Sequence, residues 1–249
     1  SNGKVCRTGD FDGNDEYVEV SDANFINGLS EFTFTAWIYN TDGFSGNDRG
    51  IFFTDSAEGK DNRLGLRYDT AGANSGNDNL LKAGVQTSTC NDSEDCVQAE
   101  SSSDTMKQNV WQHVAITWES GGNLRIYVDG NDETDSDGDN NQGQGGNIDA
   151  VDGFWIGRGA KSDEGDDWQG RIDEVKIYDQ ALNSTQINNI MNETHPCTYY
   201  NIDAGAEIGG SITPSGSVSV EEEGSITFNM SPDSGDYIIE DLLVDGISQ

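Results

Sequence analysis

Basic side chains are scarce in this sequence. It holds 13 lysine and arginine residues against 46 aspartate and glutamate residues, which gives a formal net charge of −33. Binding to nucleic acid needs clustered lysine and arginine that neutralise phosphates, so this composition excludes nucleic acid as a partner. Long apolar runs are missing too, and no stretch approaches the roughly 20 apolar residues of a membrane-spanning helix. We therefore expect no direct insertion into a membrane.

Histidine and cysteine are also few, with two and four residues, and no Cys-x-x-Cys pair occurs. These counts argue against a zinc site. An even number of cysteines is typical of disulfides in an oxidising compartment, and Cys90 and Cys96 enclose a short polar loop. The sequence therefore predicts a secreted or cell-surface protein, the alternative being four buried thiols in a cytosolic one. Four cysteines allow three pairings, which the residues alone leave open.

The surplus of acidic residues has three physical interpretations. It can keep a protein soluble at high salt, where self-repulsion is screened. It can supply oxygen ligands for a hard cation such as calcium. It can also mark a disordered chain, but the aromatic residues here fall in strand-like runs separated by glycine-rich turns. The acids are spread along the whole chain, which favours a solvated surface.

Short runs of alternating apolar and polar residues recur between Gly, Asn and Asp turns. This period of two, together with many β-branched and aromatic residues, is typical of half-buried antiparallel strands. The runs are 17–20, 32–39, 50–54, 63–68, 113–118, 124–128, 154–158 and 171–178. Many short strands joined by tight turns predict an all-β sandwich.

A single segment has a helical pattern. In residues 181–193, Leu182, Ile187 and Ile190 fall near one face, and Asn183 or Ser184 is placed to cap the helix. Two long polar loops, 70–79 and 129–149, have a length that usually indicates function or mobility.

The sequence pattern changes after Cys197. Residues 198–249 hold new short strand-like runs and an Asp245-Gly246 turn. We predict two domains: a sandwich over 1–197 and a small, partial β-repeat over 198–249, whose open edge can accept a strand from another chain.

The order of several motifs resembles a known family. They are FDGNDEYVEVSD at 11–22, FTFTAWIY at 32–39, VWQHVAITW at 110–118, LRIYVDG at 124–130, IGRG at 156–159 and WQGRIDEVKIYDQAL at 168–182. Together they resemble the concanavalin-A-like, laminin-G-like (pentraxin-type) jelly roll of extracellular proteins. The resemblance implies two antiparallel sheets of about six or seven strands each. It also implies neighbouring first and last strands, which makes a Cys6–Cys197 disulfide geometrically reasonable and leaves Cys90–Cys96 as the second.

A second resemblance covers the C-terminal residues. GGSITPSG at 209–216 and LLVDG at 242–246 are similar to the start of a bacterial surface β-repeat. Such repeats occur in tandem, so this resemblance implies a larger parent protein.

Two calcium sites are predicted. The family resemblance implies one with Asp12, Asp173 and a carbonyl such as that of Gly43; the alternative is that Asp12 caps a turn and Asp173 is an exposed strand residue. The other is in the acidic loop, where Glu133, Asp135 and Asp137 follow the spacing of a calcium loop. That loop has Gln144 where a bidentate glutamate is expected, so a hydrated acidic loop is the alternative.

The aromatic residues divide into two predicted groups. Phe44, Tyr68 and Trp155 lie at strand ends beside long loops and are the candidates for stacking on a ligand. The tryptophans within regular strands, or placed inside by the resemblance, are predicted to be core residues: Trp37, Trp111, Trp118 and Trp168.

Catalytic patterns are missing, since neither a Ser-His-Asp order nor a nucleophile elbow occurs, and we predict that the protein is not an enzyme. The predicted function is binding of an extracellular glycan or protein ligand, supported by structural Ca²⁺. One alternative is a structural subunit or spacer of a surface filament, joined to neighbouring copies by strand complementation. Another is an accessory domain of a polysaccharide-degrading enzyme.

Overall fold

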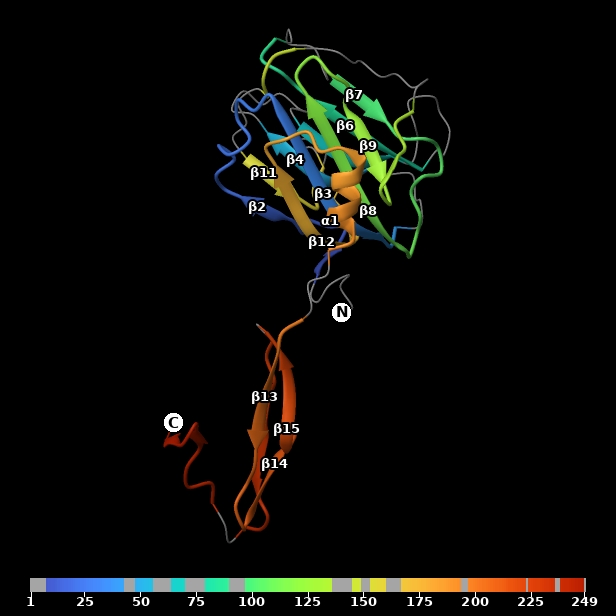
Figure 1. Ribbon diagram of the computed structural model, residues 1–249. Coiled ribbons are helices and arrows are strands. Elements are labelled where there is room, and N and C mark those ends of the chain that lie inside the picture. The colour runs from blue at the N-terminus through green and yellow to red at the C-terminus, as the bar shows by residue number, and fades with distance from the viewer. Residues whose placement is uncertain are drawn as a thin grey trace. The chain divides into compact units, whose positions relative to one another are not determined.

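The computed structural model divides the chain into two compact units, Ser1–Thr194 (unit 1) and His195–Gln249 (unit 2). It describes residues 8–42, 48–55, 64–69, 79–89, 97–135, 145–148, 153–159, 167–193, 197–222, 224–235 and 238–248 (Figure 1). Each unit is described by itself below.

Unit 1 is built from two antiparallel sheets of six described strands each. Sheet A has the order β1 (Gly9–Asp12), β12 (Gln169–Tyr178), β3 (Glu31–Asn40), β8 (Trp111–Glu119), β9 (Arg125–Val128) and β10 (Asn131–Asp132). Sheet B has the order β2 (Val18–Val20), β11 (Gly153–Ile156), β4 (Arg49–Asp55), β5 (Leu64–Asp69), β6 (Leu80–Val85) and β7 (Val97–Glu100).

The inner faces of the two sheets form one apolar core. Phe34 of β3 stacks on Phe52 of β4 with ring centroids 4.0 Å apart, and Phe52 in turn stacks on Phe154 of β11. Trp118 and Trp168 are fully buried, which confirms the prediction that both belong to the core. Alternation along the strands places these side chains inward, so the core joins residues that lie far apart in the sequence.

A helix covers part of the outer face of sheet A. It is α1 (Ser184–Met191), and Asn183 rather than Ser184 is its N-cap, in a capping box with Gln186. Ile187 and Leu182 pack against Ala115 of β8 and Tyr127 of β9, and Figure 1 shows the helix in front of the strands of sheet A.

Backbone geometry marks β12 as irregular. Gly170 has a φ of +138°, and a Cβ there would collide with the carbonyl oxygen of Tyr39, so this position requires glycine. Further along, the register with β3 shifts between Asp173 and Lys176, and Glu174 has a φ of 50°. This bulge changes which side chains of β12 face outward.

Unit 2 consists of two-stranded ribbons. β13 (Tyr199–Ala204) pairs with β15 (Gly216–Glu221), β14 (Gly210–Thr213) pairs with β16 (Asn229–Pro232), and β17 (Leu243–Val244) pairs with β18 (Ile247–Ser248). Among its described residues, none is buried.

The predicted fold class is confirmed: an all-β, two-sheet antiparallel sandwich of jelly-roll type with one short helix and small extra β ribbons. All eight predicted runs overlap strands, and the 119–123 segment joins β8 to β9 as a hairpin. Four described strands of unit 1 had no predicted run, namely β1, β6, β7 and β10.

Candidate functional site

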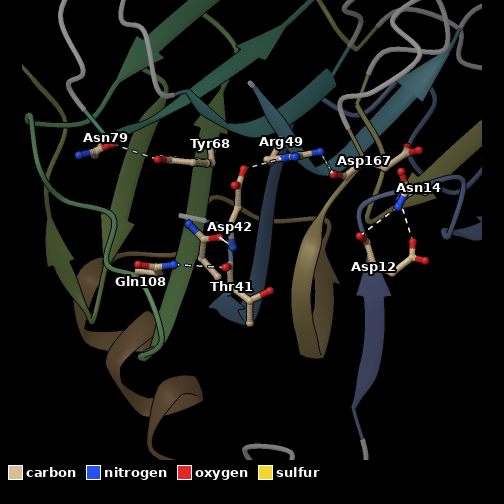
Figure 2. Close-up of polar contacts among 10 residues, drawn as sticks. Asp12, Asn14, Thr41, Asp42, Arg49, Tyr68, Asn79, Gln108 and Asp167 are labelled. Carbon is tan, nitrogen blue, oxygen red and sulfur yellow. Dashed lines mark hydrogen bonds and ion pairs between the residues drawn. The ribbon is translucent and has the colours of Figure 1, made fainter. Parts of the chain in front are cut away.

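Several strand ends of unit 1 meet at one edge of the sandwich, which we call the loop edge. There β1, β3 and β5 end, and β4, β6, β8 and β12 begin, because antiparallel neighbours alternate in direction. Figure 2 shows polar side chains from these ends pointing toward one another. A loop edge held by strand ends is a common place for a binding site on a β-sandwich.

A buried ion pair links the end of β3 to the start of β4. The Arg49 Nε atom lies 2.9 Å from Asp42 Oδ2, and both side chains are almost fully buried (Figure 2). Arg49 also donates from Nη1 to the carbonyl oxygen of Asp167, 3.0 Å away. The carboxylate of Asp167 in turn accepts the backbone N–H of Asp15 at 2.8 Å. The guanidinium therefore connects the segment after β3 to the segment before β12, and the Asp167 carboxylate connects the latter to the turn after β1.

The end of β3 is also tied to the segment before β8. Asn40 accepts the backbone N–H of Asn109 with its carbonyl and that of Asp42 with its side chain. The Gln108 side chain donates to the carbonyl of Thr41 at 3.3 Å (Figure 2). These bonds fix the backbone at this corner.

Tyr68, at the end of β5, is a buried donor rather than an exposed ring. Its hydroxyl donates to Asn79 Oδ1 at 3.0 Å, and the Asn79 amide donates to Asp104 at 3.3 Å. Burial raises the pKa of the Tyr68 hydroxyl well above its usual range, and the nearby charges of Asp42 and Asp69 raise it further. The hydroxyl therefore stays protonated and keeps this bond.

Lys82 of β6 neutralises two further acids. Its ammonium lies 2.8 Å from Asp69 and 3.1 Å from Glu100. Burial alone lowers the pKa of Lys82, but its bonds to the two carboxylates raise it overall. The buried carboxylates of Asp42, Asp69 and Asp167 thus all bind partners within the protein. These bonds stabilise the loop edge but leave the carboxylates poorly placed to bind an external ion.

A pocket of about 260 Å³ opens at the loop edge beside β8 and β9. Its lining includes exposed polar side chains, namely Ser102, Asp104, Lys107, Asp129 and Asn131, together with the partly buried Glu133. Gln112 forms part of the wall and is buried, accepting the backbone N–H of Lys107 and donating to the carbonyl of Thr105. The wall is therefore rigid, while the opening presents both donors and acceptors.

The structure does not bring Asp12 and Asp173 together. Asp12 pairs with Gln169, whereas Asp173 lies four residues further along β12, about 13 Å away at strand spacing. Asp12 accepts the backbone N–H of Asn14 at 2.8 Å, so it caps a turn, as the alternative interpretation predicted. Asp173 accepts the backbone N–H of Glu174 at the bulge. Two carboxylates this far apart cannot share one ion.

The acidic loop shows no metal cluster in the part that the structure describes. The carbonyl of Glu133 accepts the backbone N–H of Ser102, and the N–H of Asp135 donates to the carbonyl of Glu100. Asp137 and Gly43 lie outside the described residues. Among those that are described, no three His, Cys, Asp or Glu side chains gather as metal ligands. Calcium therefore stays a prediction.

Burial reverses the predicted roles of several aromatic residues. Tyr68 and Trp155 are 0% and 8% exposed, so neither offers a ring face to a ligand, and their assignment as stacking residues is corrected. Phe44, the third candidate, lies outside the described residues. By contrast Trp37 and Trp111, which were predicted to be core residues, are partly exposed. The alternation of residues 32–39 could have predicted the exposure of Trp37, because it places Trp37 on the face of the sheet opposite to Phe34.

The cysteines can be assessed in part. Cys197 takes part in a disulfide. Cys6, Cys90 and Cys96 lie outside the described residues, so the pairings Cys6–Cys197 and Cys90–Cys96 stay predictions. No helix among the described residues is long and apolar enough to span a membrane.

The sequence and fold of this chain are similar to those of known proteins. The family model of the Concanavalin A-like lectin/glucanases superfamily matches residues 12–188. None of the curated proteins matches the chain.

Solved structures resemble it at low sequence identity. Domain 4 of an extracellular arabinanase from Geobacillus stearothermophilus, in complex with arabinotriose, is 17% identical with a TM-score of 0.50, and the match covers 76% of this chain and 79% of that one. A heptameric pentraxin from Limulus polyphemus is 21% identical with a TM-score of 0.47, covering 66% and 71%. A putative carbohydrate binding protein from Bacteroides ovatus is 22% identical with a TM-score of 0.49, covering 88% and 58%. Identities this low concern the fold alone.

Proposed function

Because the chain belongs to the concanavalin A-like lectin/glucanases superfamily, we propose that it is a glycan-binding module of a secreted or cell-surface protein rather than an enzyme. The observation that carries the proposal is the polar pocket at the loop edge. The fold alone does not select a ligand, because the same sandwich supports many functions.

The lining of the pocket suits the hydroxyl groups of a sugar. Carboxylates of Asp104 and Asp129 accept hydrogen bonds, the Lys107 ammonium donates them, and the Ser102 hydroxyl and Asn131 amide do both. A volume of about 260 Å³ lies just below the range of about 300–1,000 Å³ usual for drug-sized ligands. It therefore suits a short sugar segment. The arabinanase domain that shares this fold was solved with arabinotriose, which suggests arabinose-containing glycans as the first probes.

Glycan-array binding followed by calorimetry with the best ligand tests the proposal. We expect Lys107→Ala and Glu133→Gln each to weaken binding about tenfold, since each removes one charged hydrogen-bonding group. Among the described residues, the side chains of Lys107 and Glu133 form no hydrogen bond or ion pair, and only their backbone atoms are bonded, so melting temperatures should stay unchanged.

A matched control is Glu19→Gln, an exposed glutamate on β2 of the other sheet, which should bind like the wild type. Release of reducing sugar ends by the purified protein would contradict the assignment as a binding module. If no glycan on the array binds, the proposed function itself fails.

A second candidate function is that of a structural subunit, joined to neighbouring copies through unit 2. The observation that favours it is the set of apolar side chains exposed on the ribbons, such as Tyr199, Ile202 and Leu243. Strand addition to such an edge would cover them. Sedimentation velocity at about 0.1 M and 1 M salt tests this, because screening of the net charge should promote self-association. A monomer at every protein and salt concentration would exclude it.

A further inference from the structure

The outer face of sheet A divides into two halves. Near α1 the face is covered: Thr33 and Thr35 of β3 are fully buried, and the hydroxyl of Thr33 bonds to the 180–182 segment that leads into the helix. Near the loop edge, Trp37 and Tyr39 of the same strand remain partly exposed. The residues of this second half form what we call the aromatic face: Asp10, Tyr39, Trp111 and Arg171 in one row, with Trp37 beside them.

The first row crosses four strands through a ladder of contacts. Arg171 Nε lies 2.7 Å from Asp10 Oδ1, and the Arg171 guanidinium lies 5.5 Å from the centre of the Tyr39 ring. The Tyr39 and Trp111 rings follow, with centroids 5.5 Å apart and an interplanar angle of 56°. Each side chain is thus held by the next, which orients the rings before any ligand arrives.

Trp37 extends the surface by a second row. It is two residues before Tyr39 on β3, and its ring lies 5.3 Å from that of His113 at 69°. Three spacings between strands make the first row about 14 Å long, and the two rows are about 7 Å apart.

We propose that the aromatic face is a second glycan site, which binds a neutral polysaccharide chain by stacking on Trp37, Tyr39 and Trp111. This inference rests on the proposed glycan-binding function and adds a site distinct from the pocket. Aromatic rings pair with the apolar C–H faces of sugars, and the Arg171–Asp10 pair supplies adjacent donors and acceptors for sugar hydroxyls.

The size of the face selects a glycan over a protein. Its two rows cover on the order of 100 Å², whereas a specific protein interface buries about 800 Å² on each partner. A strip of this size, with three aromatic rings and one ion pair, is therefore too small for a protein but matches a sugar chain.

Charge selects a neutral glycan over an anionic one. Arg171 is already paired with Asp10, and Asp173 brings another carboxylate to the same side of β12. The whole chain carries −33 charges, so a uronic acid or sulfated chain would be repelled.

The test is affinity electrophoresis and tryptophan fluorescence with soluble arabinan, galactomannan, xyloglucan and mixed-linkage β-glucan. We expect Tyr39→Ala and Trp111→Leu to weaken binding of the retained polysaccharide about tenfold. The matched control is Tyr17→Ala, because Tyr17 is also exposed and also lies under an arginine, Arg158 at 4.6 Å, but sits outside the face. It should bind like the wild type.

A second measurement uses the unaltered protein. The polysaccharide should shield partly exposed Trp37 and Trp111 from acrylamide quenching, while the buried Trp118 and Trp168 are insensitive with or without it. This readout holds even if a variant fails to fold. If polysaccharide binds but quenching and both face variants are unaffected, the aromatic face is excluded and the proposed function stands. If none of the polysaccharides binds while short glycans bind the pocket, the inference fails alone; if nothing binds, both fail.

Discussion

Units 1 and 2 have the same kind of sequence pattern but differ in which side chains they bury. Both alternate apolar and polar residues between glycine turns. In unit 1 two sheets face each other, so that Phe34 and Phe52 stack in a core. In unit 2 the strands form two-stranded ribbons, and Ile202 stays 41% exposed. The comparison shows that alternation predicts strands, whereas burial requires a second layer.

The two units also differ in charge. All 13 lysine and arginine residues lie in unit 1, and none lies in 195–249. In unit 1, Arg49 and Lys82 neutralise acids that the fold buries. Unit 2 buries none of its described residues, so its acids stay in water and need no cation. Two of the scarce bases, Arg49 and Lys82, therefore lie where desolvated carboxylates require a cation.

The largest expected difference between the units is in their response to loss of an apolar side chain. Phe34→Ala should lower the free energy of unfolding by about 3–5 kcal/mol, because it leaves a cavity next to Phe52. Ile202→Ala in β13 should change it by less than about 0.5 kcal/mol. Urea denaturation can be followed by tryptophan fluorescence, since all five tryptophans lie in unit 1.

Hydrogen exchange extends this test to unit 2, which has no tryptophan. Amides of β3 should exchange slowly and those of β13 quickly, because the ribbon has no buried residue to protect it. Strong protection of the β13 amides from exchange in the isolated chain would contradict the conclusion that the two units differ in burial.

A somewhat smaller effect is expected at the buried ion pair. Arg49→Met should cost about 3 kcal/mol, because Asp42 and the carbonyl of Asp167 lose their donor while remaining buried. The control Arg125→Met removes an exposed pair with Asp132 and should cost less than about 1 kcal/mol. Thermal melts of both variants measure the contrast; equal costs would show that burial of the Arg49 pair is not what stabilises the edge.

A pH dependence should follow from Lys82. Its pKa is raised in the folded protein by Asp69 and Glu100, although burial alone lowers it. The folded state thus holds this proton more tightly than the unfolded chain, so the stabilisation is complete below the ordinary value of 10.5 and is lost as pH rises through the folded pKa. Melting temperatures between pH 8 and 12 should fall less steeply for Lys82→Met than for the wild type, and parallel curves would contradict this.

Much of the fold was predictable from the sequence. The strand runs and the helix with its cap near Asn183 correspond to the structure, because they depend on local periodicity. The family resemblance, which depends on the order of several motifs, is confirmed as well. Strands β6 and β7 had no predicted run: their neighbours in the sheet, not their own short sequences, decide that they pair.

The candidate site was less predictable. Tyr68 and Trp155 stand beside long loops, yet their rings are buried, because sequence position does not reveal what packs over a strand end. Asp12 and Asp173 looked like a pair because the family motif places them at the first and last strands. Only the register of β1 on β12 shows how far apart they lie.

The smallest expected effect concerns those two aspartates. If they held one calcium ion, Asp12→Asn and Asp173→Asn would each remove the same site, and the double variant would be no worse than either single one. At about 13 Å apart they should act independently, so their effects on stability should add within about 0.5 kcal/mol. Melting curves of the wild type and three variants, each with excess calcium and with chelator, measure both sensitivity and additivity. Loss of chelator sensitivity in both single variants would show that one ion does join these residues and that β1 and β12 pair differently in solution.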